Sequence, residues 1–193
     1  MKITPEQTNE LIRKRRAIFP SMYHQEKTIP TDVILQILEN ANWAPTHKHT
    51  EPWRFKIFTG NSLESLSDFM GDFYKNNTAE ESFSGMKYKK TVKKPLQSAC
   101  VIAICMQRDP KESIPEWEEI ASVACAVQNM WLTATAYGIG AYWSSPKSIY
   151  SAAEFLGLKE GQRCLGFFYM GYYFDNEISA HRKPINDKIQ WMK

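Results

Sequence analysis

The order of hydrophobic and polar residues along the chain predicts both helices and strands. Residues 34–41 and 116–137 carry apolar side chains three and four positions apart, the spacing that gives a helix one apolar face. Residues 53–58 alternate instead, as a half-buried strand does. Residues 99–106 form an unbroken apolar run, which is typical of a strand covered on both faces. The pattern therefore predicts helices packed against a sheet, an α+β fold.

Capping residues and proline mark the expected ends of the helices. Thr4-Pro5-Glu6-Gln7 has the form of a capping box with proline at the first position, which predicts a helix from Pro5 to about Arg15. Thr31 is the expected cap of the next helix, and Pro45 ends it. The other expected elements are a helix from Asn61, a polar loop at 76–84, strands at 141–144 and 164–174, a helix at 148–156, and an irregular tail at 175–193.

Length and composition predict a single domain spanning residues 1–193. A chain of 193 residues can bury about 70% of its unfolded surface in one core, and neither a repeat nor a linker divides it. No apolar run approaches the ~20 residues that a membrane span needs. The N-terminal residues lack the hydrophobic segment of a signal peptide, so we expect a cytoplasmic protein.

Cysteine and charge patterns narrow the expected environment and partners. The cysteines lie in apolar stretches without a Cys-x-x-Cys pair, so we expect buried, reduced thiols. They are Cys100, Cys105, Cys125 and Cys164. A net charge of +3 is too small to indicate a nucleic-acid partner. Lysines concentrate between residues 87 and 94, and this run is either a solvated face or a surface that attracts an anionic cofactor or dinucleotide.

Adjacent arginines near the N-terminus suggest an anion site. Arg15 and Arg16 precede Ala17, and guanidinium groups bind phosphate through paired, charge-assisted hydrogen bonds. From the residues alone, the pair is equally the basic end of a helix. Arg182 and Lys183 form a second basic pair in the tail. The residues therefore leave both a phosphate site and a solvated helix end open.

The segment between the second helix and the first strand carries more hydrogen-bonding side chains than a turn requires. His47, His49 and Glu51 are spaced by two, so in an extended chain they would share one face and could ligate a metal ion. Pro45 and Pro52 bend the segment, and no fourth ligand is evident. Ordinary loop histidines are the simpler alternative.

The arginine pair and the segment Ala44-Pro45-Thr46-His47 through Pro52-Trp53-Arg54-Phe55 together resemble the flavin-binding signature of the nitroreductase family. Residues 138–145, Gly-Ile-Gly-Ala-Tyr-Trp-Ser-Ser, are similar to the family segment beside the flavin ring. This stretch follows a helix and enters a strand, the reverse of a dinucleotide-binding loop. The resemblance runs from about residue 11 to the C-terminus. It implies a mixed, mostly antiparallel sheet in an intertwined homodimer.

The resemblance also implies which residues bind FMN. They are Arg15, Arg16, Ala17, Trp43, His47, Trp143, Ser144, Ser145 and Arg182. Those near the two termini would hold the phosphate and ribityl chain, and residues 143–145 would lie beside the ring. Trp43 and His47 would reach the flavin held mainly by the partner subunit. The family usually has serine at the position of Ala17, so here only the backbone N–H could bind, and the lost hydrogen bond contributes about 0.5–1.5 kcal/mol.

The function implied by the resemblance is an FMN-dependent oxidoreductase. It would take a hydride from NADH or NADPH and reduce nitroaromatics, quinones or related small acceptors by a ping-pong mechanism. The flavin carries the redox chemistry, so neither a catalytic side chain nor a metal is expected. Alternatives from other classes are a non-enzymatic flavin-binding or redox-sensing protein and a metal-binding module built on His47, His49 and Glu51. The apolar residues scattered through the tail lead us to expect that it lies across the partner subunit.

Overall fold

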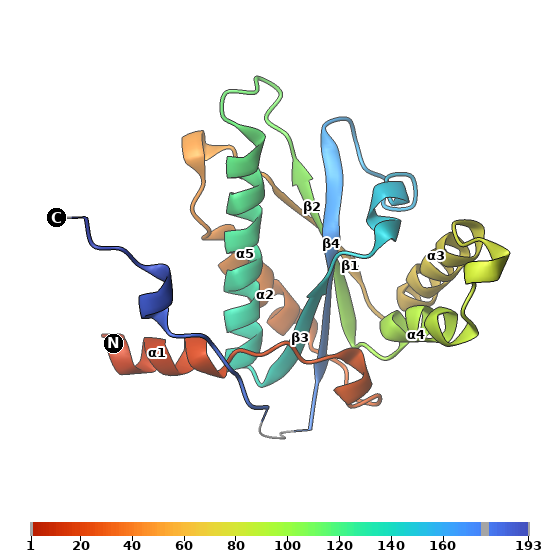
Figure 1. Cartoon of the computed structure of the whole chain (residues 1–193), viewed down its shortest axis with the longest axis horizontal. Helices are drawn as coiled ribbons and strands as arrows, with labels where there is room; N and C mark the ends of the chain where they lie inside the picture. Colours follow the sequence, from red (N-terminus) through yellow and green to blue (C-terminus); the bar gives the residue numbers. More distant parts are fainter. Residues whose placement is uncertain (1, 175–177, 193) are drawn as a thin grey trace.

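The computed structural model describes residues 2–174 and 178–192 and contains a four-stranded sheet with helices on both faces (Figure 1). The strands are β1 (Trp53–Phe58), β2 (Cys100–Gln107), β3 (Ile139–Ser144) and β4 (Gln162–Tyr172), in the order β1-β2-β4-β3. These strands pair antiparallel throughout. One parallel bridge joins Ala17 to Ala141 at the outer edge of β3. The predicted α+β fold with a mixed, mostly antiparallel sheet is confirmed.

The helices form two layers, one on each face of the sheet (Figure 1). One layer holds α2 (Thr31–Asn42) and α5 (Glu116–Ala136), and the other holds α3 (Ser62–Asn76) and α4 (Gly85–Leu96). Successive side chains of a strand point to opposite faces. Ile102 and Ile104 therefore pack with α2 and α5, whereas Val101 and Ala103 pack in the α3 layer. The unbroken apolar run of β2 is buried on both faces, as predicted.

Helix α1 (Pro5–Lys14) begins with the predicted capping box. The Gln7 amide donates to Thr4 Oγ1 at 3.3 Å, and the Thr4 amide donates to Gln7 Oε1 at 3.0 Å. The expected cap of α2 is wrong by one residue. The Ile34 amide already donates to the Pro30 carbonyl at 3.1 Å, so Thr31 is the first helical residue and Pro30 occupies the cap position.

Two further local predictions are wrong. The helix expected at 148–156 is only a short 3-10 helix, η4 (Lys147–Ser151), followed by turns. Serine and tyrosine in this segment have modest helix propensity, and burial of Ala152 and Leu156 in the α3 layer overrides it. Cys125 is exposed rather than buried, because it lies on the outer side of α5; the other cysteines are buried, and all are free.

The tail lies beside α1 and apart from the sheet (Figure 1). Residues 175–177, where the predicted arm begins, lie outside the described residues. The described part includes a short 3-10 helix, η5 (Ile185–Lys188). Ile178 is half-buried and packs against the α3 layer, whereas the large apolar side chains from Ile185 onward are exposed, with Trp191 at 82%. In the described chain, no helix combines the length and hydrophobicity that a membrane span requires.

Candidate functional site

Arginines from both ends of the chain gather beside the C-terminal half of α5. The Arg15 guanidinium lies 4.6 Å from the centre of the Trp131 ring, a cation–π contact. Partial burial, and then the nearby charges of Arg182 and Arg16, lower the pKa of Arg15 from its ordinary value. Guanidinium groups nevertheless stay protonated in proteins, so the like charges persist and repel one another. We call Arg15, Arg16 and Arg182 the arginine cluster.

The arginine cluster has no acidic partner in the part of the chain that the structure describes. The ion pairs there involve other cations, namely Lys14, His47, Lys75, Arg108 and Arg163. A bound anion would offset the repulsion within the cluster by charge-assisted hydrogen bonds. The arrangement therefore has the chemistry of an anion site, such as a phosphate site.

Arg16 joins the end of α1 to the beginning of the described tail. Its Nε donates to the carbonyl of Ile178 at 3.2 Å, and its Nη1 donates to the carbonyls of Arg13 and Arg15. On the other side, Trp131 Nε1 donates to the Arg16 carbonyl at 3.0 Å. These contacts fix the tail against α1, which explains how Arg182 comes close to Arg15 from the opposite end of the chain.

Ala17 continues from the arginine cluster along the edge of the sheet. It bridges to Ala141, and the Ile18 amide donates to the Ala141 carbonyl at 2.9 Å. β3 is an edge strand, and no described segment bridges to its outer side beyond Ala141. Such an edge presents backbone N–H and C=O groups. Residues 142–144 therefore offer an open backbone edge directly beside the cluster.

The predicted site residues 143–145 do not all face one way. Trp143 packs against the α2 and α5 layer, whereas Tyr142 packs in the α3 layer, which is also the side of Ser144 by strand alternation. Ser145 follows the strand and is exposed. Trp143 Nε1 is buried and has no hydrogen-bond partner among the described residues. A buried donor left unpaired costs about 1–3 kcal/mol, so a ligand acceptor reaching it would be favoured.

Gly166 makes room for Trp143. Its φ of +145° is one that side-chain-bearing residues rarely adopt, and a Cβ there would lie 2.5 Å from Trp143 Nε1 and 2.6 Å from the Ser144 carbonyl oxygen. The neighbouring strand therefore has to carry glycine at this point. The position of the Trp143 ring at the edge of the proposed site depends on this close approach.

His47 lies away from the arginine cluster within one chain. His47 Nδ1 is 2.6 Å from Glu118 Oε2 in the first turn of α5. Trp131, which marks the cluster, lies roughly 20 Å further along the same helix at a rise of ~1.5 Å per residue. Trp43 is 78% exposed, and its Nε1 donates to Glu39 at 3.1 Å. One chain therefore brings Arg15, Arg16 and Arg182 together but leaves His47 outside that group, and Trp43 makes no contact with these arginines among the interactions of the described residues.

The loop that carries His47 is held against the start of α5 by hydrogen bonds. Lys48, His49 and Glu51 have φ angles of 51°, 55° and 41°, in the left-handed region that residues other than glycine rarely adopt. Lys48 Nζ donates to the Ser113 carbonyl at 2.9 Å, which helps to hold this backbone. Within residues 2–174 and 178–192, no group of three histidine, cysteine, aspartate or glutamate side chains could hold a metal ion. His47 instead pairs with Glu118.

A cavity of about 880 Å³ opens between α3, α4 and η4, where β3 ends. Residues 146–148, directly after the predicted 143–145 group, form one wall, and Lys87 and Thr91 of α4 contribute another. Ser148 is only 3% exposed, and its Oγ has no hydrogen-bond partner among the described residues. The sequence analysis did not predict this site, because it assigned residues 148–156 to a helix. The proline and serine that follow Ser145 were the available signal.

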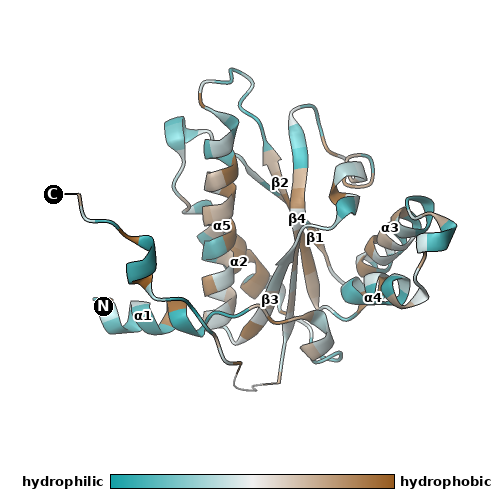
Figure 2. Ribbon diagram, viewed as in Figure 1, coloured by the Kyte–Doolittle hydropathy of each residue, from teal (hydrophilic) through white to brown (hydrophobic). Residues whose placement is uncertain are grey.

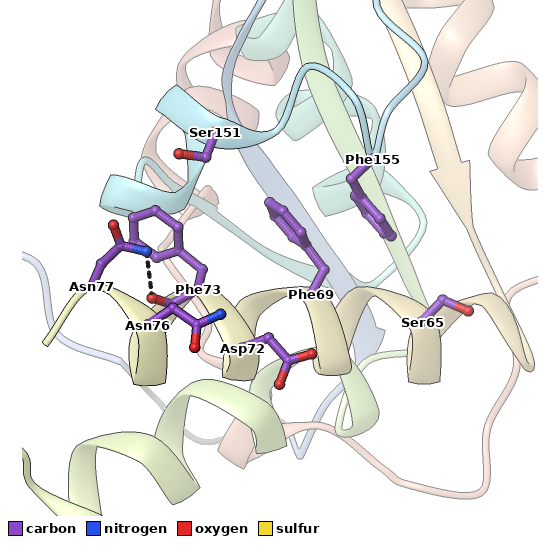
Figure 3. Close-up of a pocket in the computed structure, with 8 residues that line it drawn as sticks. All are labelled: Ser65, Phe69, Asp72, Phe73, Asn76, Asn77, Ser151 and Phe155. Atoms are coloured by element: carbon purple, nitrogen blue, oxygen red, sulfur yellow. Dashed lines mark hydrogen bonds between the residues drawn. The ribbon is translucent and has the colours of Figure 1, made fainter.

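A shallower hollow lies between α3 and the segment that carries Ser151 and Phe155 (Figure 3). The rings of Phe69 and Phe155 stack there with centroids 4.4 Å apart and planes within 4°. Asn77 Nδ2 donates to the carbonyl of Phe73 at 2.9 Å. No residue that lines this hollow is basic. We interpret it as a packing contact between α3 and the segment after η4, not as an anion site.

Known proteins with the same fold and related sequences place the chain in a family. The nitroreductase family model matches residues 12–172. A Bacillus subtilis protein with a provisional NAD(P)H nitroreductase name is 28% identical over 187 residues, which cover 95% of this chain and 93% of the relative. A nitroreductase-like family protein from Bacillus cereus matches with a TM-score of 0.83 at 28% identity, over 100% of both chains.

A further solved structure shares the fold at lower identity. It is the FMN-dependent nitroreductase of Mycobacterium smegmatis in complex with NADPH, with a TM-score of 0.77 at 16% identity, covering 96% of this chain and 98% of that one. The family model spans the arginine pair, the His47 loop and the edge strand β3. This chain belongs to the nitroreductase family.

Proposed function

We propose that residues 1–193 form one FMN-binding domain that takes a hydride from NADH or NADPH and reduces nitroaromatic, quinone or related small acceptors by a ping-pong mechanism. The observation that carries the proposal is the arginine cluster, which has no acidic partner in the described chain and adjoins the open edge of β3. Relatives named for NAD(P)H and FMN support the same donor and cofactor. A cytoplasmic location stays a prediction from the sequence.

The residues present fit FMN in charge and in hydrogen-bonding capacity. The arginine cluster would hold the phosphate through charge-assisted hydrogen bonds. The backbone N–H and C=O groups of the open edge at residues 142–144 would hold polar atoms of the ring. When bound, FMN would supply hydride acceptance from the nicotinamide and hydride delivery to the acceptor. The protein would position the reactants and stabilise negative charge, so no side chain is assigned as catalytic.

We propose FMN rather than FAD because the cluster suits one terminal phosphate. The glycines at 138 and 140 follow α5 and enter β3, so they do not form the strand-to-helix loop that binds a pyrophosphate. Heat release of the cofactor from purified protein, followed by chromatography against FMN and FAD standards, tests the assignment. Recovery of FAD would overturn it.

Enzymatic turnover distinguishes this proposal from a redox-sensing flavoprotein. We expect steady oxidation of NADH or NADPH, followed by the loss of nicotinamide absorbance, only when a quinone or nitroaromatic acceptor is present. Parallel lines in double-reciprocal plots at several acceptor concentrations would support the ping-pong order. Stoichiometric FMN without such turnover would favour the non-enzymatic alternative.

We further propose that the active unit is a homodimer with two equivalent flavin sites. α1 buries none of its residues, and Trp43, Trp117 and Trp191 are 78%, 68% and 82% exposed. Hydrophobic segments recur at the end of α1 and along the tail (Figure 2). Apolar surface of this extent is typical of an interface. Because His47 lies far from the cluster of its own chain, a twofold partner is what would bring it to a flavin.

Sedimentation of the full chain and of a truncation ending at Phe174 tests the dimer. We expect the full chain to sediment as a dimer with bound FMN. The truncated chain should dissociate and lose FMN, because it lacks Arg182 and the exposed apolar tail. A full-length monomer that keeps stoichiometric FMN and oxidises NAD(P)H would contradict this proposal.

A further inference from the structure

We propose that the cavity between α3, α4 and η4 binds the electron acceptor and selects aromatic acceptors that carry a carboxylate or similar anionic group. We call it the acceptor cavity. The inference rests on the proposed function, because an acceptor site is meaningful only beside a bound flavin. Family membership alone indicates neither where the acceptor binds in this chain nor which charge the acceptor carries.

The acceptor cavity continues the line of proposed flavin contacts. β3 ends at Ser144, and residues 146–148 form a wall of the cavity. An occupant would therefore lie immediately beyond the part of the strand that is proposed to hold the ring. The volume of about 880 Å³ falls within the range of small-molecule sites, ~300–1,000 Å³. The space is sufficient for an aromatic acceptor.

Aromatic and apolar side chains form much of the cavity wall. Met70, Phe73 and Tyr74 come from α3, and Tyr150 comes from η4. Phe73 lines both this cavity and the shallower hollow, and Figure 3 shows its ring between α3 and Ser151. The Tyr74 hydroxyl accepts from the Ser84 amide at 3.1 Å, so the chain itself engages this polar group. Rings of this kind pack favourably on planar aromatic ligands.

The polar side of the acceptor cavity consists of donors and cations. The buried Ser148 hydroxyl has no partner in the described chain, and a ligand oxygen would satisfy it. Lys87 and Lys147 also line the cavity, are exposed to solvent and form no ion pair among the described residues. None of the lining residues is acidic. Aromatic walls, a buried donor and two ammonium groups together favour an aromatic ring with an anionic oxygen.

The lysines of α4 lie on different sides of the helix, so one that lines the acceptor cavity can be compared with one that does not. Lys87 lines the acceptor cavity, whereas Lys90 lines a different hollow together with Phe19 and Pro20. Both side chains are exposed, so neither substitution removes core packing. Ser65 lines the shallower hollow of Figure 3 and is the corresponding control for Ser148.

Binding of a ligand that cannot be reduced tests the inference without turnover. The FMN-loaded full-length protein is titrated with benzoate and with benzamide, its neutral counterpart, while the visible absorbance of the flavin is followed. We expect benzoate to bind about tenfold more tightly. Ser148→Ala should weaken benzoate binding about fivefold, and Lys87→Ala about threefold because its charge is solvated. Lys90→Ala and Ser65→Ala should leave binding unchanged.

The outcomes separate this inference from the proposed function. FMN-loaded protein that does not distinguish benzoate from benzamide, or in which neither Ser148→Ala nor Lys87→Ala weakens benzoate binding, overturns the inference alone. Loss of FMN from both variants, with FMN retained in Lys90→Ala, would assign the cavity to the flavin and also overturn it. Absence of FMN from the unmodified protein would contradict the proposed function, and the acceptor site with it. If Ser148→Ala folds poorly, benzoate binding by Lys87→Ala still tests the inference, because Lys87 is exposed and its substitution removes no core packing.

Discussion

The two ends of α5 use charge in opposite ways. At its N-terminal end, each glutamate pairs with a basic side chain from another segment. These pairs are Glu116 with Arg163 at 3.0 Å, Glu118 with His47 at 2.6 Å, and Glu119 with Arg108 at 2.5 Å. Towards the other end, the arginine cluster is held by the Trp131 ring and by backbone carbonyls, with no carboxylate partner in the described chain.

The charged side chains at the start of α5 are paired within the protein, whereas the arginines near its other end are available to bind a ligand. Paired groups fix the loops around the first turn of α5, and acidic residues there also suit the helix dipole. Their fields largely cancel. The arginine cluster keeps an uncancelled positive field beside an open strand edge, which is the arrangement that attracts an anion. Substitutions at the paired end should therefore affect stability most, and those at the unpaired end should affect FMN binding most.

The largest effect is expected from Glu119→Ala at the paired end. Glu119 is fully buried and accepts from Arg108 Nη1 and, at 2.8 Å, from the Asp109 amide. Removing the carboxylate leaves the largely buried Arg108 guanidinium with only the exposed Glu112 carboxylate, at 3.9 Å, and loss of a buried pair costs about 3–5 kcal/mol. The free energy of unfolding in urea measures this loss. Glu64→Ala, an exposed control on α3, should change it by less than ~0.5 kcal/mol. A loss below ~1 kcal/mol for Glu119→Ala would contradict a structural role for this pair.

At the unpaired end, Arg15→Ala should weaken FMN binding by about 1.5–3 kcal/mol, the contribution of a charge-assisted hydrogen bond. Fluorescence titration of FMN into cofactor-free protein measures it, and the exposed neighbour Arg13→Ala is the control. Arg16→Ala should weaken FMN binding similarly and also release the Ile178 carbonyl, so the dimer should weaken with it. Unchanged affinity in both Arg15→Ala and Arg16→Ala would mean that the phosphate lies elsewhere.

Glu118→Gln tests whether the two ends meet across a dimer. The His47 side chain is 56% exposed, so loss of this ion pair should lower the free energy of unfolding by at most ~1 kcal/mol. His47 would be held less firmly, and FMN affinity should fall about threefold if this side chain contacts the partner's flavin. Glu116→Gln removes a comparable pair that faces Arg163 and should leave FMN affinity unchanged. Equal effects of the two substitutions would argue against a specific role for His47.

The smallest expected effect depends on pH and lies at the paired end. Hydrogen bonds from the Ser113 hydroxyl and from the Ser113 and Lys111 amides lower the pKa of Asp109 from 3.8 to about 2. Because the folded pKa lies below the unfolded one, this stabilisation is present above pH 3.8 and is lost as the pH falls towards 2. Urea midpoints of the unmodified protein and Asp109→Asn should therefore differ near pH 5 and converge at low pH. A pH-independent difference would show that ionisation of Asp109 is not the cause.

Most elements could be predicted from the sequence because burial leaves a local pattern. The apolar run of β2 and the apolar stripe of α5 are decided by contact with the core, so their residue types reveal them. The segment 148–156 was mispredicted because its apolar residues fit a helical spacing equally well. In the structure, packing of Ala152 and Leu156 in the α3 layer accompanies a short 3-10 helix followed by turns. Cys125 shows the same limit, since a helix that is apolar on most sides does not reveal its outer face.

The candidate site was predictable only where residue type alone carries the chemistry. Arg15 and Arg16 indicate an anion site because arginine suits phosphate in any fold. That Arg182 joins them depends on the path of the tail, and the family resemblance, not a local pattern, suggested it. Apart from the proline and serine that follow Ser145, the acceptor cavity left no signal in the sequence, because its lining side chains come from α3, α4 and η4, which are far apart along the chain.

By itself, the sequence determined the α+β class and most helix and strand positions, and it suggested an anion site near the N-terminus. Each of these depends on periodicity or on residue type within a short segment. Only the tertiary structure decided that Trp143 faces the α2 and α5 layer, that His47 pairs with Glu118 far from the arginine cluster, and that Ser148 is buried at a cavity. These features depend on which distant segments pack together, and local patterns of hydrophobicity and charge do not encode that choice.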